Sequence, residues 1–120
     1  MHTVIINADP HTEKGSHWLA VLLLPRSSSA YYFDSYGMPP TLVPAIQEFI
    51  RHNCTVSDYN RSQLQGLTSN VCGKYCCLFA LYADRGYDPS QIVLLLVAGD
   101  RQIERAFLVE FGPLRPGRRC

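Results

Sequence analysis

The 120-residue sequence lacks any long hydrophobic run and any secretion signal. Its longest apolar stretch, Ile92–Ala98, is far too short to span a bilayer, and Met1–Pro10 has neither a basic start nor an apolar core. The five cysteines are odd in number and two are adjacent, which does not suit a disulfide framework. These absences predict an intracellular protein in a reducing compartment, without a membrane partner.

The sequence also lacks a basic face. Three of its 11 basic residues are arginines of the segment 113–120, so residues 1–112 carry 8 basic against 10 acidic side chains. A large nucleic-acid footprint normally needs an excess of positive charge, so the composition gives weak support to DNA as a partner. We expect residues 1–112 to form a single domain and residues 113–120 a solvated basic tail.

The first third of the sequence predicts β-structure. Val4–Ala8 is rich in β-formers, and His17–Leu24 is almost wholly apolar, as in a central strand buried on both faces. A tight turn separates it from Ala30–Asp34, a run rich in aromatics. Strand, turn and strand together predict an antiparallel hairpin.

The rest of the sequence is mainly helical in pattern. We expect a helix capped by Thr41 that runs to about Arg51, with Leu42, Ile46, Phe49 and Ile50 on one face. A short edge strand is expected within Thr55–Gln65. Two more helices are expected at Ser90–Val97 and Asp100–Phe111, split at Gly99 and capped by Asp88 or Ser90 and by Asp100. The whole pattern predicts an α+β fold with antiparallel strands first and helices packed on one side.

A polar turn running into a hydrophobic helix organises the chain. Asn70 is a candidate N-cap, and the helix that follows, as far as about Gly86, contains few charges. Cys72 would lie at the N-terminus of this helix, where exposed amides and the helix dipole favour the thiolate. Cys76 and Cys77 are interpreted as small core residues. A buried helix with a cysteine at its positive end predicts a nucleophile, provided that a base lies nearby.

Four residues provide the groups that a cysteine protease needs. His17 opens one predicted strand and Asp34 closes the next, so an antiparallel hairpin would bring the imidazole and the carboxylate to one end of the sheet. Gln65 supplies a neutral amide seven residues before Cys72. This amide and the Cys72 backbone N–H could form a two-donor oxyanion hole.

Three motifs carry a family resemblance. They are Gly15-Ser16-His17-Trp18, the run Tyr32–Gly37 (YFDSYG), and Gln65-Gly66 followed by Cys72-Gly73 with Cys76-Cys77. Their order resembles the clan of the adenovirus maturation protease (adenain) and the SUMO/ubiquitin-like-protein proteases. The gap of seven residues and the Cys-Gly-x-x-Cys-Cys pattern resemble adenain most.

The resemblance implies roles and partners. His17 would be the general base, Asp34 its orienting acid, Cys72 the nucleophile and Gln65 the oxyanion donor. The fold would be papain-like in circularly rearranged form, with a small mixed or antiparallel sheet packed on the central cysteine helix. Cys54 matches the position at which the adenovirus enzyme forms a disulfide with an activating viral peptide; the alternative is an unpaired loop cysteine.

The family also implies a substrate class and a site of action. Substrates would be viral or mobile-element precursor proteins with small residues, especially glycine, near the cut. A nuclear or virion location and stimulation by DNA are further implications. Family members carry a helical, substrate-binding segment before the His-Trp strand, whereas only 16 residues precede His17 here. We therefore expect that N-terminal lobe to be largely missing.

Other interpretations stay open at this point. The chain could remove a ubiquitin-like modifier, or it could be a truncated, inactive remnant that only binds protein. A metal site built on Cys72, Cys76 and Cys77 is disfavoured because no histidine follows at a suitable spacing. The protease chemistry itself needs no cofactor.

Overall fold

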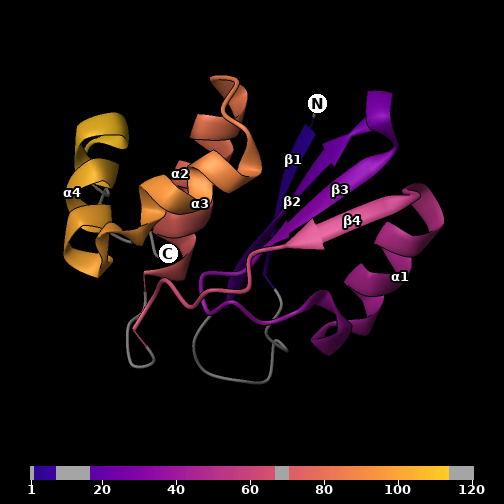
Figure 1. Cartoon of the computed structure of the whole chain (residues 1–120). Coiled ribbons are helices and arrows are strands. Elements are labelled where there is room, and N and C mark those ends of the chain that lie inside the picture. Colours follow the sequence, from indigo (N-terminus) through magenta and orange to yellow (C-terminus); the bar gives the residue numbers. More distant parts are fainter. Residues whose placement is uncertain (1, 8–16, 67–70, 114–120) are drawn as a thin grey trace.

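The computed structural model describes residues 2–7, 17–66 and 71–113 (Figure 1). A four-stranded sheet has the order β1-β2-β3-β4, with β1–β2 and β2–β3 antiparallel and β3–β4 parallel. The predicted hairpin and edge strand are confirmed, and the sheet is mixed. The strands are β1 (His2–Asn7), β2 (Trp18–Leu24), β3 (Ser29–Phe33) and β4 (Val56–Tyr59).

Strand β2 is buried on both faces, as its apolar sequence predicts. Leu19 and Val21 pack in one hydrophobic cluster, and the alternate residues Ala20 and Leu22 pack in another. The first cluster includes Ile46 and Ile50 of helix α1 (Pro44–Asn53), and the second includes most of the buried residues of helix α2 (Cys72–Asp84). The expectation of helices on one side is therefore wrong: α1 covers one face of the sheet, and the other helices cover the opposite face (Figure 1).

Helix α1 (Pro44–Asn53) begins later than predicted. Thr41 lies in a short 3-10 turn, Pro40–Leu42, and does not cap the helix. The residue before a proline is disfavoured in the helical region, so Val43, at φ −125° and ψ 85°, lies outside that region and α1 starts at Pro44. Of the predicted apolar face only Ile46 and Ile50 are buried. Leu42 and Phe49 are 60% and 46% exposed.

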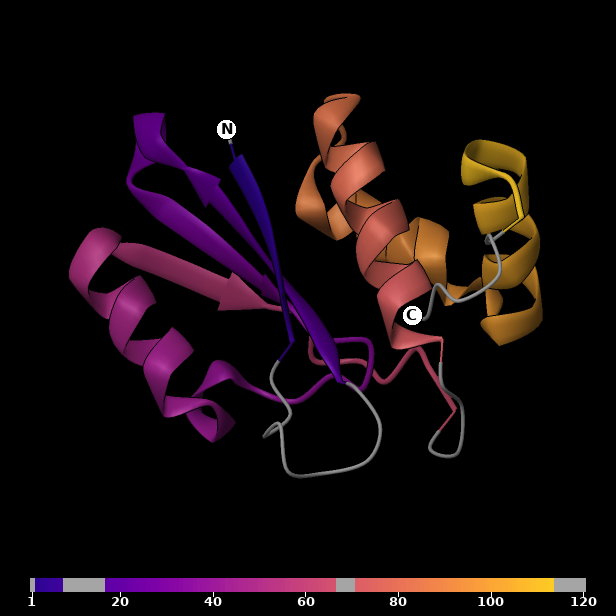
Figure 2. The ribbon, with the colours of Figure 1, turned by 180° about the vertical axis from the view of Figure 1, so that it is seen from behind.

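Helix α2 (Cys72–Asp84) begins at the predicted nucleophile. Val71 occupies its N-cap position, and the proposed cap Asn70 lies outside the described residues. Six of its residues are buried, and Phe79 stacks on Phe33 of β3 with ring centroids 4.6 Å apart. Contacts with β2, α3 and α4 surround the helix. Figure 2 shows its first turn next to the end of the sheet at which β2 begins.

Two further helices complete the described chain. Asp88 and Gln91 form a capping box at the start of α3 (Pro89–Leu95), which leads into a 3-10 turn, Leu96–Ala98. Helix α4 (Asp100–Phe111) has the predicted bounds and follows the break at Gly99, where φ is +93°. Gly99, not Asp100, occupies its N-cap position. No helix among the described residues is long and apolar enough to cross a membrane.

The turn after β3 depends on a glycine. Gly37 has φ +74°, its N–H donates to the Asp34 carbonyl at 2.8 Å, and an added Cβ would lie 2.7 Å from the Ser62 carbonyl carbon. Both the left-handed backbone and the close approach exclude a side chain. Gly37 therefore lets the turn that carries Asp34 pack on the segment around Ser62.

We predict that Gly37→Ala destabilises the protein more than Gly86→Ala. Gly86 has φ +93° but nothing within 4 Å of an added Cβ, so it carries only the backbone penalty of about 1–2 kcal/mol. Gly37→Ala adds a steric clash with backbone and should cost at least about 1 kcal/mol more. Urea unfolding of the two variants measures the difference. Equal losses would contradict the close packing at Gly37.

Candidate active site

The hairpin brings the predicted base and acid together. His17 immediately precedes β2, and Asp34 immediately follows β3. Because Ala20 pairs with Phe33, the antiparallel register carries both residues to the same end of the sheet. His17 Nε2 lies 3.1 Å from Asp34 Oδ1, and the His17 ring tilts against Tyr36 at a centroid distance of 4.9 Å. The carboxylate is thus placed to orient the imidazole.

Asp34 is itself held by backbone and side-chain hydrogen bonds. The residue is 2% exposed, and the Tyr36 N–H donates to its Oδ1 at 2.9 Å. The buried Asn60 side chain accepts from the Asp34 N–H at 3.0 Å and donates to the Asp34 carbonyl at 2.6 Å. This reciprocal pair fixes the backbone that presents the carboxylate. The position of the acid therefore does not depend on its contact with His17 alone.

The predicted nucleophile lies beside this pair. Cys72 is the first residue of α2 and is 3% exposed. Its Sγ accepts a hydrogen bond from the Trp18 backbone N–H at 3.5 Å. Because Trp18 follows His17 directly in the chain, the thiol lies close to the backbone that carries His17. The donated N–H and the N-terminal position on a helix both favour negative charge on sulfur.

Gln65 is buried and bonded to the same turn as Asp34. It is 1% exposed, and the Ser35 hydroxyl donates to its Oε1 at 2.5 Å. The Ser35 carbonyl also accepts from the backbone N–H groups of Leu64, at 2.8 Å, and Gln65, at 3.0 Å. Asp34 and Ser35 are adjacent, so one dipeptide contacts both His17 and Gln65.

A second set of contacts ties the Gln65 segment to helices α2 and α4. The Tyr75 hydroxyl of α2 lies 3.0 Å from the Leu64 carbonyl and 2.9 Å from Asp100 Oδ1. Asp100 Oδ2 accepts from the Gly66 N–H at 3.2 Å. Burial, and then the hydrogen bond to Asp100, raise the pKa of Tyr75, so its hydroxyl stays protonated as a donor. Asp100 thus binds this loop, whereas the sequence predicted it as a helix cap.

The sequence reasoning did not find four of these residues. Ser35 and Asn60 lie in polar turns, and their partners are 30 and 26 residues away. Tyr75 lies in an apolar helix, and Asp100 was predicted as a cap. Hydrogen bonds between residues so far apart leave no periodic pattern in the sequence. Only Ser35 could have been noticed in the sequence, as the polar residue directly after Asp34. No cluster of three or more metal-ligating His, Cys, Asp or Glu side chains occurs within the described ranges.

Cys54 lies apart from the other predicted site residues. It follows α1, is half-buried, and has a reduced thiol. It lines a pocket of about 230 Å³ together with Leu24, Ser29 and Phe49. Leu24 and Ser29 face each other at the end of the β2–β3 hairpin that is opposite to His17 and Asp34. Cys54 is therefore placed away from the candidate catalytic group.

We predict that Asn60→Ala destabilises the protein by about 2 kcal/mol or more, because it leaves the buried Asp34 N–H without a partner and removes one of the two hydrogen bonds to the Asp34 carbonyl. The matched control is Asn53→Ala, since the exposed Asn53 amide donates to the Phe49 carbonyl at 2.7 Å. Its loss should change the free energy of unfolding by only about 0.5 kcal/mol. Chemical denaturation measures both. Similar small losses would mean that Asn60 does not hold Asp34.

Comparison with known proteins gives relatives among viral proteases. The chain is 31% identical over 109 residues to the protease of human adenovirus D serotype 17, covering 77% of this chain and 52% of that protein. It is 30% identical over 129 aligned positions to the protease of porcine adenovirus A serotype 3, covering 92% of this chain and 61% of the relative. No protein-family model matches. The chain spans about half the length of the curated relatives it matches.

The fold also matches a solved viral protease. A crystal structure of an ASFV protease superposes with a TM-score of 0.62 at 19% identity, covering 88% of this chain and 40% of that one. At this identity the match supports the α+β fold, not a shared specificity. Identity of 30% or more to adenovirus proteases over most of this sequence supports a closer relation. The chain is therefore similar in sequence to the adenovirus proteases (adenain), over about half of their length.

Proposed function

We propose that the chain is a thiol-dependent endopeptidase that acts through Cys72, His17 and Asp34, with Gln65 as oxyanion donor. The observation that carries this proposal is the His17–Asp34 contact of 3.1 Å beside a cysteine at a helix N-terminus. The Trp18 N–H, whose nitrogen lies 3.5 Å from Cys72 Sγ, connects the cysteine to the strand that follows His17. We also propose that residues 1–112 form one domain with the rearranged papain-like order.

The acylation step follows from this arrangement. His17 takes the proton of the Cys72 thiol before attack, and Asp34 stabilises the resulting imidazolium. The Cys72 thiolate then attacks the substrate carbonyl carbon. The carbonyl oxygen becomes an oxyanion that the Cys72 N–H and the Gln65 amide can bind. Amides in the first turn of a helix lack intrahelical acceptors, which suits the Cys72 N–H to this role.

Deacylation uses the same groups. The C–N bond breaks as His17 returns the proton to the leaving amine, which leaves a thioester on Cys72. Water then attacks the thioester carbon, His17 accepts a proton from the water, and the C–S bond breaks. The products are a carboxylate and the regenerated Cys72. By family, we propose viral or mobile-element precursor proteins with glycine near the cut as substrates.

We predict that Cys72→Ala abolishes hydrolysis of glycine-containing precursor peptides, measured by mass spectrometry of the products. Cys77→Ala is the matched control, since Cys77 lies half-buried on the same helix and its substitution should leave activity intact.

Gln65→Ala should lower kcat by about 100-fold or more. A panel of ubiquitin-like-modifier conjugates tests the alternative specificity.

Hydrolysis that survives Cys72→Ala would contradict the proposed nucleophile. A folded wild-type protein that cleaves no peptide and no conjugate would contradict the endopeptidase proposal and favour a protein-binding remnant.

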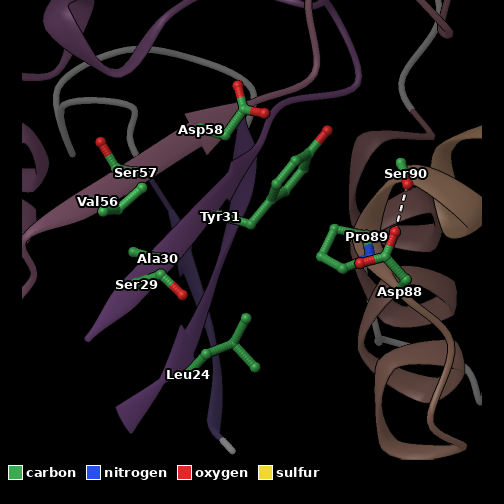
Figure 3. Close-up of a pocket in the computed structure, with 10 residues that line it drawn as sticks. All are labelled: Leu24, Ser29, Ala30, Tyr31, Val56, Ser57, Asp58, Asp88, Pro89 and Ser90. Carbon is green, nitrogen blue, oxygen red and sulfur yellow. Dashed lines mark hydrogen bonds between the residues drawn. The ribbon is translucent and has the colours of Figure 1, made fainter. Parts of the chain in front are cut away.

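We also propose that Cys54 forms a disulfide with a cysteine of an activating peptide. Strand β4 starts two residues after Cys54 and is an edge of the sheet, so an extended peptide could pair with it. A second pocket of about 230 Å³ lies along this edge, between Tyr31 and Asp58 on the sheet and Asp88 and Pro89 at the start of α3 (Figure 3). Burial above all, and then the Asp58 charge, raise the pKa of Tyr31 to about 12, so its hydroxyl stays neutral there.

We predict that Cys54 is the residue captured when ten-residue peptides with one cysteine are supplied as mixed disulfides with glutathione. Exchange would join the peptide sulfur to Cys54 and release glutathione, so no further oxidant is needed. Cys54→Ser should abolish the adduct seen by mass spectrometry. The Val56 N–H donates to the Ser28 carbonyl at 3.3 Å, so the next N–H along the strand, that of Ser57, faces the free edge of β4. Ser57→Pro, which obstructs pairing at that edge, should reduce capture of peptides but not of glutathione alone. Equal capture of both by the variant would contradict an extended peptide on β4.

A further inference from the structure

We propose that Ser35 is a positioning residue that determines which end of the Gln65 amide faces the reacting carbonyl. This inference rests on the proposed function, because it concerns the oxyanion donor of the same site. Ser35 is completely buried, and it makes three hydrogen bonds to the Leu64–Gln65 segment. Two of these bonds hold the backbone, and the third reaches the side-chain amide itself.

The direction of the third bond matters for the chemistry. A glutamine amide has an acceptor end, Oε1, and a donor end, Nε2, which are nearly equal in size. An oxyanion is stabilised only by the donor end, and the acceptor end would repel it. The Ser35 hydroxyl donates to Oε1 at 2.5 Å. By holding the acceptor end, Ser35 fixes the rotation of the amide so that Nε2, the donor end, is directed away from the hydroxyl.

The same contact improves the donor. A hydrogen bond to an amide oxygen polarises the amide, which strengthens the bonds that its N–H groups donate. The buried setting adds to this effect. Ser35 and Gln65 are 0% and 1% exposed, so water competes little for the hydrogen bond between them. Ser35 thus acts on the reaction through Gln65 and does not touch the substrate.

The position of Ser35 in the chain couples the two halves of the site. It follows Asp34 directly, and the turn is closed by the Gly37 N–H bond to the Asp34 carbonyl. One rigid turn therefore orients the imidazole through Asp34 and the oxyanion donor through Ser35. A shift of this turn would disturb both groups together.

The test is a double-mutant cycle on hydrolysis by the full chain. Ser35→Ala should lower kcat by at least about 10-fold, but by less than the roughly 100-fold expected for Gln65→Ala. KM should stay unchanged, because the oxyanion forms only in the transition state. In the Gln65→Ala background, Ser35→Ala should have no further effect on kcat. Ser27→Ala, at an exposed serine of the 3-10 turn between β2 and β3, is the control and should leave kcat unchanged. Equal losses in both backgrounds would overturn the proposal.

A second measurement does not depend on turnover. NMR relaxation of the Gln65 side-chain NH2 group reports whether the amide is fixed. Its signal is assigned as the one that disappears in Gln65→Ala. We expect an ordered amide in the wild type and a mobile one in Ser35→Ala. An equally ordered amide in Ser35→Ala would overturn the inference. Because this result can be read without substrate, failure of the positioning role is distinguished from failure of the proposed activity.

Discussion

The antiparallel pairing of β2 with β3 is the constraint on which the candidate site depends. Its register carries His17 and Asp34 to one end of the sheet, at a distance of 3.1 Å between Nε2 and Oδ1. The pairing is secured from both sides, because the alternating residues of β2 bury themselves in two separate hydrophobic clusters. A slip of one residue would exchange these faces and separate His17 from Asp34.

The second half of the site is attached to this hairpin by a few buried polar contacts. Asn60 and Ser35 bind the turn after β3 to the segment that ends at Gln65. Tyr75 and Asp100 then connect the same segment to α2, whose first residue is Cys72. Fixed side chains of this kind place reacting groups before substrate arrives, which lowers the entropic cost of catalysis.

Sequence reasoning predicted the parts of this protein that depend on local pattern. The apolar run before Pro25 predicted the central strand, and the break at Gly99 predicted the bounds of α4. It failed where a neighbour or a distant residue decides the outcome. Pro44 displaced the start of α1 from Thr41, and α1 covers the face of the sheet that the prediction left open. The roles of Ser35 and Asn60 were missed because their partners are far away in sequence, and neither residue belongs to a hydrophobic pattern.

The central claim is that Cys72 and His17 act as a nucleophile–base pair. The most direct measurement is the ultraviolet absorbance of the Cys72 thiolate between about pH 4 and pH 9, taken as the difference between the wild type and Cys72→Ser. The account predicts a thiolate that persists well below the pKa of about 8.5 of an ordinary cysteine, and its loss at low pH in His17→Ala. A thiol that titrates near 8.5 in both proteins would contradict the pairing.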